Sequence, residues 1–173
     1  MEIIVNDTNI FIDLYSCNLL DDFFKLPYNV HTTDFVISEL KQAEQQKAVT
    51  EFCNSGKLTV KSFNPYEIAS IWKYFRKANK VCNISIEDCS VLTYTKSLEK
   101  ARLLTGDKTL RTRAEGEGIV VSGVLFIFDE LVKHEIITQK EASTYLKILV
   151  EKNVRLPKDE IEKRIILWEQ QFK

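Results

Sequence analysis

The chain has 173 residues, of which 45% are hydrophobic and 28% charged, and its formal net charge is −1. This length predicts one well-packed domain, and the balance of 24 basic and 25 acidic residues excludes the general basic field that many nucleic-acid binders have. No apolar stretch approaches the ~20 residues needed to cross a bilayer, and Glu2 stands where the basic start of a signal peptide would be, so we expect a cytoplasmic protein without a membrane segment.

Short apolar runs alternate with longer amphipathic runs along the chain, and these periods predict strands and helices. The predicted strands cover residues 2–5, 29–32, 58–63, 101–105 and 118–122. The predicted helices cover residues 10–24 (one or two helices), 34–52 (with a further stretch after 43), 64–75, 85–98, 108–115, 138–148 and 157–168. Gly56 interrupts the pattern before the third strand.

Several helices begin with a capping box, in which a polar N-cap residue and an acid three residues later bind each other's backbone N–H groups. The pairs are Asn64 with Glu67, Ser85 with Asp88, and Thr138 with Glu141. These signals fix the starts of the helices better than periodicity alone does.

Strands separated by helices indicate right-handed crossovers and a parallel sheet. We therefore predict a three-layer α/β/α fold with a central, mostly parallel sheet of about five strands, formed by residues 1–125. Residues 126–173 are predicted to be wholly helical and to pack on the same domain as a C-terminal extension.

Cysteines and histidines give no indication of a site. The cysteines lack the CxxC spacing of zinc sites, so we expect reduced, partly buried thiols. The two histidines, His31 and His134, stand alone, which argues against a histidine-based nucleophile or metal site.

Acidic residues follow two of the predicted strands. Asp7 comes after EIIVN, and Asp107 comes after ARLLTG. Two helix openings contain further acids, Glu39 in TTDFVISEL and Asp88 in SIEDCSVL. Ligands of an open parallel sheet bind beyond the carboxyl ends of its strands. If these helices begin near the same edge, the carboxylates converge there.

Each acid also has a purely structural explanation. Asp7 could cap the following helix, and Asp88 occupies a capping-box position. Glu39 lies in the first or second turn of a helix, where an acid favours the dipole, and Asp107 fits a Thr-Gly-Asp turn. The functional interpretation therefore rests on the joint arrangement.

Clustered carboxylates need compensation, because like charges at ~4–6 Å repel and raise one another's pKa. The hard cations Mg²⁺ and Mn²⁺ prefer oxygen ligands and suit a site that must admit a phosphate. Such a cluster favours metal-assisted hydrolysis of phosphodiester bonds.

The four segments together resemble the PIN-domain nuclease family. IVNDTNIFID, DFVISEL, SIEDCSVL, and ARLLTGDKTLR followed by GIVVSG match the order of the family's acids, from about residue 2 to about residue 122. The helical tail, with GIVVSGVLFIFDELVKHEIIT before it, resembles a VapC-like bacterial and archaeal branch that is often part of toxin–antitoxin systems.

The resemblance implies that Asp7, Glu39, Asp88 and Asp107 are catalytic and coordinate Mg²⁺ or Mn²⁺. Glu87 stands beside Asp88. Successive helix residues point about 100° apart, so only one of the two can face the site, and we prefer Asp88.

Further residues surround these acids. The resemblance implies that Asn9 orients Asp7 and that the Thr105 hydroxyl supports the metal ligands. Some family members have another acid two residues after the last aspartate; Thr109 occupies that position, so a second tightly bound metal is not implied. Lys108 and Arg111 directly follow Asp107 and are candidates for contact with substrate phosphates.

The implied function is an endoribonuclease that uses an activated water for in-line hydrolysis of RNA and leaves a 5′-phosphate. The branch also implies a small antitoxin partner and a homodimer, for which exposed apolar residues within 146–149 or 165–168 are candidate contacts. A catalytically silent PIN-like module that binds protein or RNA is the alternative. Aspartyl-phosphate proteins fit poorly, since related phosphatases have an acid where Asn9 stands and receiver domains have paired acids after the first strand.

Overall fold

A computed structural model describes residues 1–170, and its centre is a five-stranded parallel sheet. The strands are β1 (Glu2–Asn6), β2 (Tyr28–Thr33), β3 (Leu58–Lys61), β4 (Arg102–Leu104) and β5 (Val120–Ser122). Their order is β3-β2-β1-β4-β5, and every pairing is parallel. The predicted fold class is confirmed.

Ten helices accompany the sheet within the described residues. They are α1 (Thr8–Ser16), α2 (Leu20–Phe23), α3 (Asp34–Glu39), α4 (Ala43–Asn54), α5 (Pro65–Ala78), α6 (Ile86–Ser97), α7 (Lys108–Gly116), α8 (Val124–Lys133), α9 (Gln139–Lys152) and α10 (Lys158–Gln170). All of the predicted capping boxes are present, at the starts of α5, α6 and α9.

The structure divides two of the predicted helices. The helix predicted at 10–24 is α1 and α2, because Asn18 between them adopts the left-handed backbone (φ 58°), which asparagine tolerates better than most residues. The helix predicted at 34–52 is α3 and α4, because Leu40 turns to an extended conformation. No glycine or proline marks that second break, so the sequence pattern does not show it.

The central position of β1 explains its composition. Ile4 pairs in register with Val30 of β2 and with Arg102 of β4, so β1 has a neighbour on each side. Both Ile4 and Val5 are fully buried. A parallel strand covered on both faces has a continuous apolar sequence rather than an alternating one.

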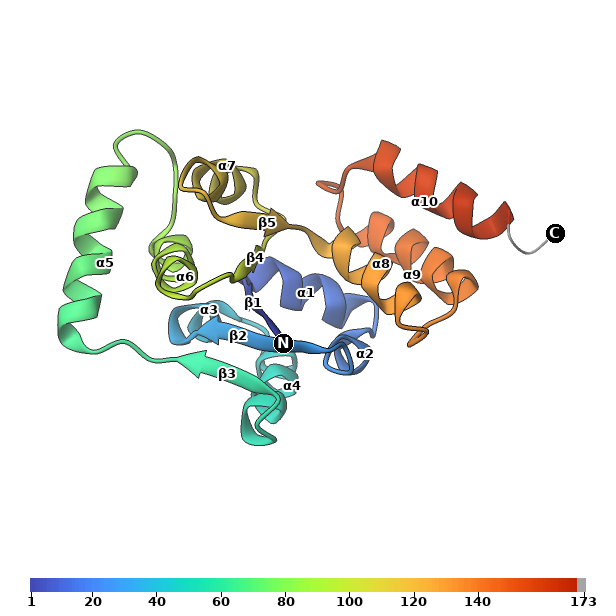
Figure 1. The fold of residues 1–173 in the computed structure, drawn as a ribbon, viewed down its shortest axis with the longest axis horizontal. Coiled ribbons are helices and arrows are strands. Elements are labelled where there is room, and N and C mark those ends of the chain that lie inside the picture. Colours follow the sequence, from blue (N-terminus) through green and yellow to red (C-terminus); the bar gives the residue numbers. More distant parts are fainter. Residues whose placement is uncertain (171–173) are drawn as a thin grey trace.

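The strand order reverses beside β1. The chain proceeds from β1 outward through β2 to β3, and then crosses to β4 and outward to β5 (Figure 1). The crevice of an open parallel sheet lies where the strand order reverses, here between β1 and β4. Asp7 directly follows β1, and Asp107 follows β4 after a two-residue turn, so both lie at the carboxyl edge of this crevice.

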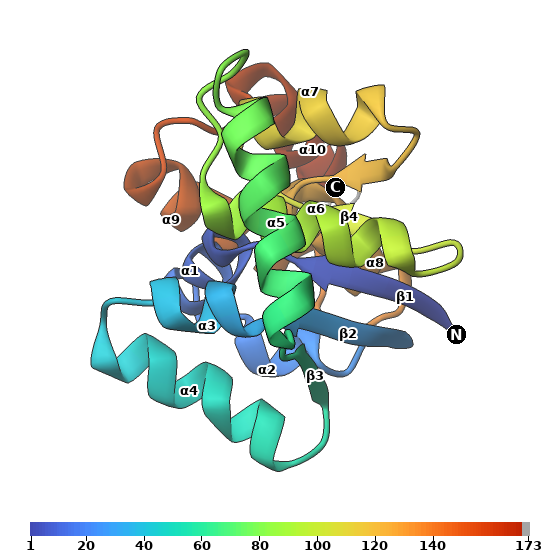
Figure 2. The same cartoon turned by 90° about the vertical axis from the view of Figure 1, so that its left-hand side faces the viewer.

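Helices cover the sheet and also lie beyond it at both ends of the molecule. α6 contacts β1, β2 and β4, and α5 lies along its outer side in both views (Figures 1 and 2). α8, α9 and α10 lie at the opposite end of the molecule from α5 (Figure 1). α9 contacts α1 and α8, and α10 packs on α9.

The C-terminal helices are held mainly by apolar packing. Phe128, Leu146, Leu149, Ile161 and Trp168 are buried among them. A boundary between a core of 1–125 and an extension of 126–173 stays a prediction, and residues 171–173 lie outside the described part of the chain.

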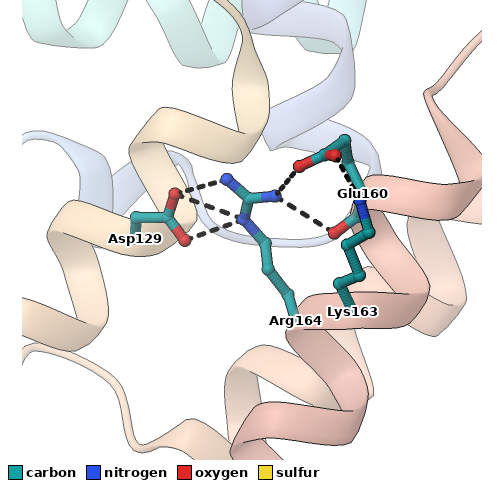
Figure 3. A network of polar contacts seen from close by, with 4 residues as sticks. All are labelled: Asp129, Glu160, Lys163 and Arg164. Atoms are coloured by element: carbon teal, nitrogen blue, oxygen red, sulfur yellow. Dashed lines mark hydrogen bonds and ion pairs between the residues drawn. The ribbon is translucent and has the colours of Figure 1, made fainter.

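Ion pairs link α10 to α8 at the surface (Figure 3). The Arg164 guanidinium donates to both oxygens of Asp129, at 2.9 Å from Nε and 2.8 Å from Nη2, and its Nη1 lies 3.2 Å from Glu160. Lys163 also pairs with Glu160, at 3.1 Å. Since partly exposed pairs contribute at most about 1 kcal/mol each, this network orients α10 more than it stabilises it.

All four cysteines are free thiols, of which Cys17 and Cys89 are buried. Within residues 1–170, no helix is both long and apolar enough to cross a membrane.

A buried carboxylate connects α1 to the end of α9. Asp13 is 5% exposed, and the Asn153 side-chain amide donates to its two oxygens at 3.0 and 3.2 Å. Next to it, the Lys152 ammonium donates to the Ser16 carbonyl at 2.6 Å. Burial raises the pKa of Asp13 to about 6, and the Asn153 amide only partly offsets this.

This pKa predicts a pH-dependent contribution to stability. The folded protein binds the Asp13 proton more tightly than the unfolded chain does, so the free energy of unfolding should fall as pH rises from about 4 to about 6. The rise of the Asp13 pKa from 3.8 to about 6 corresponds to about 3 kcal/mol at most. Asp13→Asn should remove this part of the slope. The neighbouring Cys17 does not titrate there, because burial raises its pKa to about 12.

Urea unfolding of wild type and Asp13→Asn at pH 4, 5, 6 and 7 measures the effect. We expect the variant to gain stability relative to wild type with rising pH. Parallel stability curves for the two proteins would contradict the assignment.

Candidate active site

Asp7 is the N-cap residue of α1 and lies directly beyond β1. Its backbone is extended (φ −85°, ψ 161°), and its Oδ1 accepts a hydrogen bond from the Thr8 N–H at 2.7 Å. The side chain is 3% exposed. The capping interpretation is therefore confirmed, but a cap at a solvent-exposed helix start would not need such burial.

Thr105 connects the two aspartates across the crevice. Its buried hydroxyl donates to Asp7 Oδ2 at 2.7 Å and accepts from the Asp107 N–H at 3.0 Å. Asn9 adds a second link: its Nδ2 donates to Asp7 Oδ2 at 2.5 Å, and its Oδ1 accepts from the Gly106 N–H at 2.8 Å. The ends of β1 and β4 are thus fixed relative to each other.

Glu39 reaches the same region from α3. The Thr8 hydroxyl donates to Glu39 Oε2, so Thr8 contacts both Asp7 and Glu39. Glu39 lies in the second turn of α3, as predicted, but α3 has only six residues and Glu39 is its last, so the expected favourable effect of the helix dipole is absent. The helix dipole disfavours a carboxylate at that end, and the Thr8 hydroxyl compensates for it.

Asp88 and Asp107 are both held at helix starts. Asp88 Oδ2 accepts from the Ser85 N–H at 2.9 Å in the capping box of α6. Asp107 is the N-cap of α7, and its Oδ1 accepts from the Leu110 N–H at 2.8 Å. The Ser85 N–H favours the ionised form of Asp88 against the burial that raises the pKa of this side chain.

The four carboxylates act on one another electrostatically. Burial, followed by the charges of Asp88 and Glu39, raises the pKa of Asp7 to about 7 against the hydrogen bonds from Thr105 and Thr8. The pKa of Asp88 is also raised, first by burial and then by Asp107 and Glu39. Their charges are therefore near enough to influence one another, and their convergence on one site stays a prediction.

The chemistry of this donor set fits a hard divalent cation. Glu39, Asp88 and Asp107 each use one oxygen for a protein hydrogen bond, and the other oxygen has no donor among residues 1–170. As the side chains stand, no three acidic, histidine or cysteine residues in that range form a group close enough to hold a metal ion. Mg²⁺ usually keeps several waters and binds through one or two carboxylates, so a closed group is not required.

The predicted phosphate-binding residues differ in their environment. Arg111 is half-buried, and its guanidinium lies 3.3 Å from the Thr105 carbonyl, 3.4 Å from the Val121 carbonyl and 3.5 Å from Glu115. Lys108 is exposed and has no ion-pair partner in the described part of the chain. Lys108 is thus the more available of the two.

Sequence reasoning missed Thr8 and Asn6. Thr8 is adjacent to Asp7 in the sequence, but its contact with Glu39 depends on where α3 ends. Asn6 is fully buried, and neither polar atom of its side chain has a partner among residues 1–170. The preference for Asp88 over Glu87 stays a prediction; Asp88 is the one whose charge raises the pKa of Asp7.

Comparison with known proteins identifies the family. A family model described as PIN domain matches residues 3–170, so the chain belongs to the PIN domain family. Among solved structures, it is similar to VapBC2 from Rickettsia felis bound to a DNA fragment from their promoter (18% identity, TM-score 0.46, covering 70% of this chain and 98% of that chain). It is also similar to FitAcB from Neisseria gonorrhoeae (15% identity, TM-score 0.40, covering 68% and 95%). No curated protein matches it.

The Thr105 hydroxyl predicts a measurable effect on stability. Thr105→Val keeps the shape of the side chain but leaves the buried Asp7 carboxylate and the Asp107 N–H each without one partner. We expect the free energy of unfolding to fall by roughly 1–3 kcal/mol in urea unfolding.

Thr112→Val is the matched control, because that exposed hydroxyl bonds only to the Lys108 carbonyl in its own helix. Its effect should stay within about 0.5 kcal/mol. Equal effects of the two substitutions would show that Thr105 does not hold the site together.

Proposed function

We propose that the protein is a divalent-metal-dependent endoribonuclease that hydrolyses RNA phosphodiester bonds and serves as the toxin of a toxin–antitoxin system. The main support is that Asp7 and Asp107 follow the two central strands of a PIN-domain sheet, while the charges of Asp88 and Glu39 raise the pKa of Asp7 and those of Asp107 and Glu39 raise the pKa of Asp88. Carboxylates without histidine or cysteine suit Mg²⁺ or Mn²⁺, and neither catalytic serine nor cysteine chemistry is suggested there.

Different residues of the chain would bind the metal, orient its ligands and contact the substrate. The four acids would hold Mg²⁺ or Mn²⁺, which when bound neutralises charge at the phosphate and lowers the pKa of water. Thr105 and Asn9 keep the Asp7 carboxylate in one orientation. Fixed groups of this kind need little reorganisation during reaction, which is the main source of electrostatic catalysis. Lys108 would contact a neighbouring substrate phosphate.

The proposed partners are an antitoxin and a second copy of the chain, and both rest on the resemblance of the sequence to VapC-like proteins. Of the apolar residues considered as contacts, Leu146, Leu149 and Trp168 are buried and unavailable. The exposed ones remain as candidate contacts: Ile148 on α9 is 37% exposed, and Ile166 and Leu167 on α10 are 49% and 56% exposed.

A catalytically silent PIN module is the second candidate. It is favoured by one observation, that no three potential ligands among residues 1–170 stand close enough together to hold a metal ion. A direct assay of RNA cleavage separates the two candidates.

The proposal predicts that neutralising either central aspartate abolishes cleavage. Asp7→Asn and Asp107→Asn should each lower the rate of RNA cleavage in Mn²⁺ by roughly 100-fold or more, which is about 3 kcal/mol of transition-state stabilisation. Both variants should remain folded, because asparagine also caps helices and the buried Asp7 is ionised only at a cost.

Gel analysis of a labelled RNA, with detection of 5′-phosphate ends, measures the rate. Asp21→Asn is the control, since Asp21 is exposed on α2 away from the sheet edge, and it should cleave like wild type. Full activity in both site variants, or no cleavage by wild type with any divalent metal, would refute the enzymatic proposal.

A further inference from the structure

A groove of about 920 Å³ opens beside the acids and extends to the C-terminal helices. At one end it is lined by the residues that surround the acids, Asn9, Thr105, Gly106 and Asp107. At the other end it is lined by Lys152, the last residue of α9, and by four residues of the segment that joins α9 to α10, Asn153, Arg155, Leu156 and Pro157. The groove therefore connects the candidate active site to the helical extension.

The cations of the groove outnumber its acids. Lys108 and Arg111 line it near Asp107, and Lys152 and Arg155 line it on the α9–α10 segment. The two acids that line the groove are Asp107 and Asp13, and Asp13 is buried, with the Asn153 amide bound to it. In a chain with a net charge of −1, this is a local concentration of positive charge.

Arg155 is the more available of the two cations at the α9–α10 end of the groove. It is exposed, and its side chain makes no ion pair or hydrogen bond within residues 1–170, whereas Lys152 donates to the Ser16 carbonyl. Its backbone is nevertheless fixed, because the Arg155 N–H donates to Asn153 Oδ1 at 3.0 Å while the Asn153 amide binds Asp13. A fixed backbone with a free guanidinium suits the recognition of an anion from a partner.

The remaining surface of the groove is apolar. Ile12 on α1 is 39% exposed, Leu156 is half-buried and Pro157 is exposed. Apolar surface beside a row of cations matches a nucleic-acid strand, whose phosphates are charged and whose base faces are not.

We propose that this groove binds the RNA strand on one side of the cleaved bond, and that Arg155, with Lys152 beside it, contacts backbone phosphates there. This inference rests on the proposed function, because it takes RNA as the substrate. It assigns to the C-terminal extension a part in holding the substrate, while hydrolysis belongs to the sheet edge.

The test is the salt dependence of RNA binding, measured in chelator so that the strand is not cut. For single strands, the slope of log K against log salt is about −0.7 per phosphate contact, so Arg155→Ala should reduce its magnitude by about 0.7. Affinity at low salt should fall by roughly tenfold, as expected for one lost charged hydrogen bond. Arg155→Lys should keep the slope of wild type.

Arg76→Ala is the matched control, because Arg76 is exposed on α5 at the opposite end of the molecule (Figure 1). It should leave both affinity and slope unchanged. Equal behaviour of Arg155→Ala and Arg76→Ala would overturn the groove assignment, even if wild type cleaves RNA. A wild type that binds RNA with the Arg155-dependent slope but does not cleave it would support the groove and refute the proposed enzyme. Absence of RNA binding by wild type would refute both.

Discussion

The mutual repulsion of like charges at one edge of a parallel sheet is the constraint on which this structure depends. Parallel strands direct their carboxyl ends to the same edge, and the reversal of strand order beside β1 opens a crevice there. Asp7 and Asp107 follow the two strands that border it. The fold stabilises the resulting charges with donors: the Thr105 hydroxyl for Asp7, and helix-start N–H groups for Asp88 and Asp107. Burying the Asp7 carboxylate costs more than a simple helix cap requires, which is consistent with the functional role proposed for it.

The C-terminal helices are connected to the candidate active site through α1. α1 begins at the Asp7 cap and continues to Asp13, which binds Asn153 at the end of α9. Trp168, 5% exposed, fixes α10 by burial worth about 2–4 kcal/mol, which exceeds the contribution of the partly exposed Arg164 network. Contacts through α1 therefore link the α9–α10 segment to the acids.

The sequence predicted the parts of the fold that local chemistry determines. Apolar periodicity and the capping boxes located the strands and most helices, and the order of acids identified the PIN family. It missed what depends on tertiary contact. No residue type marks the break at Leu40, so the sequence does not show that α3 ends at Glu39. The contact of Thr8 with Glu39, the internal contacts of Arg111 and the groove beside Arg155 all join segments distant in sequence, and one sequence does not encode their distances.

The most direct test of the central claim is thermal unfolding of wild type and Asp107→Asn, each with chelator and with Mn²⁺. A metal that binds only the folded protein at 100 times its Kd adds about 2.7 kcal/mol, or roughly 5–10 °C for a chain of this size. The account predicts this rise for wild type and its loss in Asp107→Asn, whose helix cap is retained. A wild type that does not respond to Mn²⁺, or a variant that responds equally, would show that the four acids do not form one metal site.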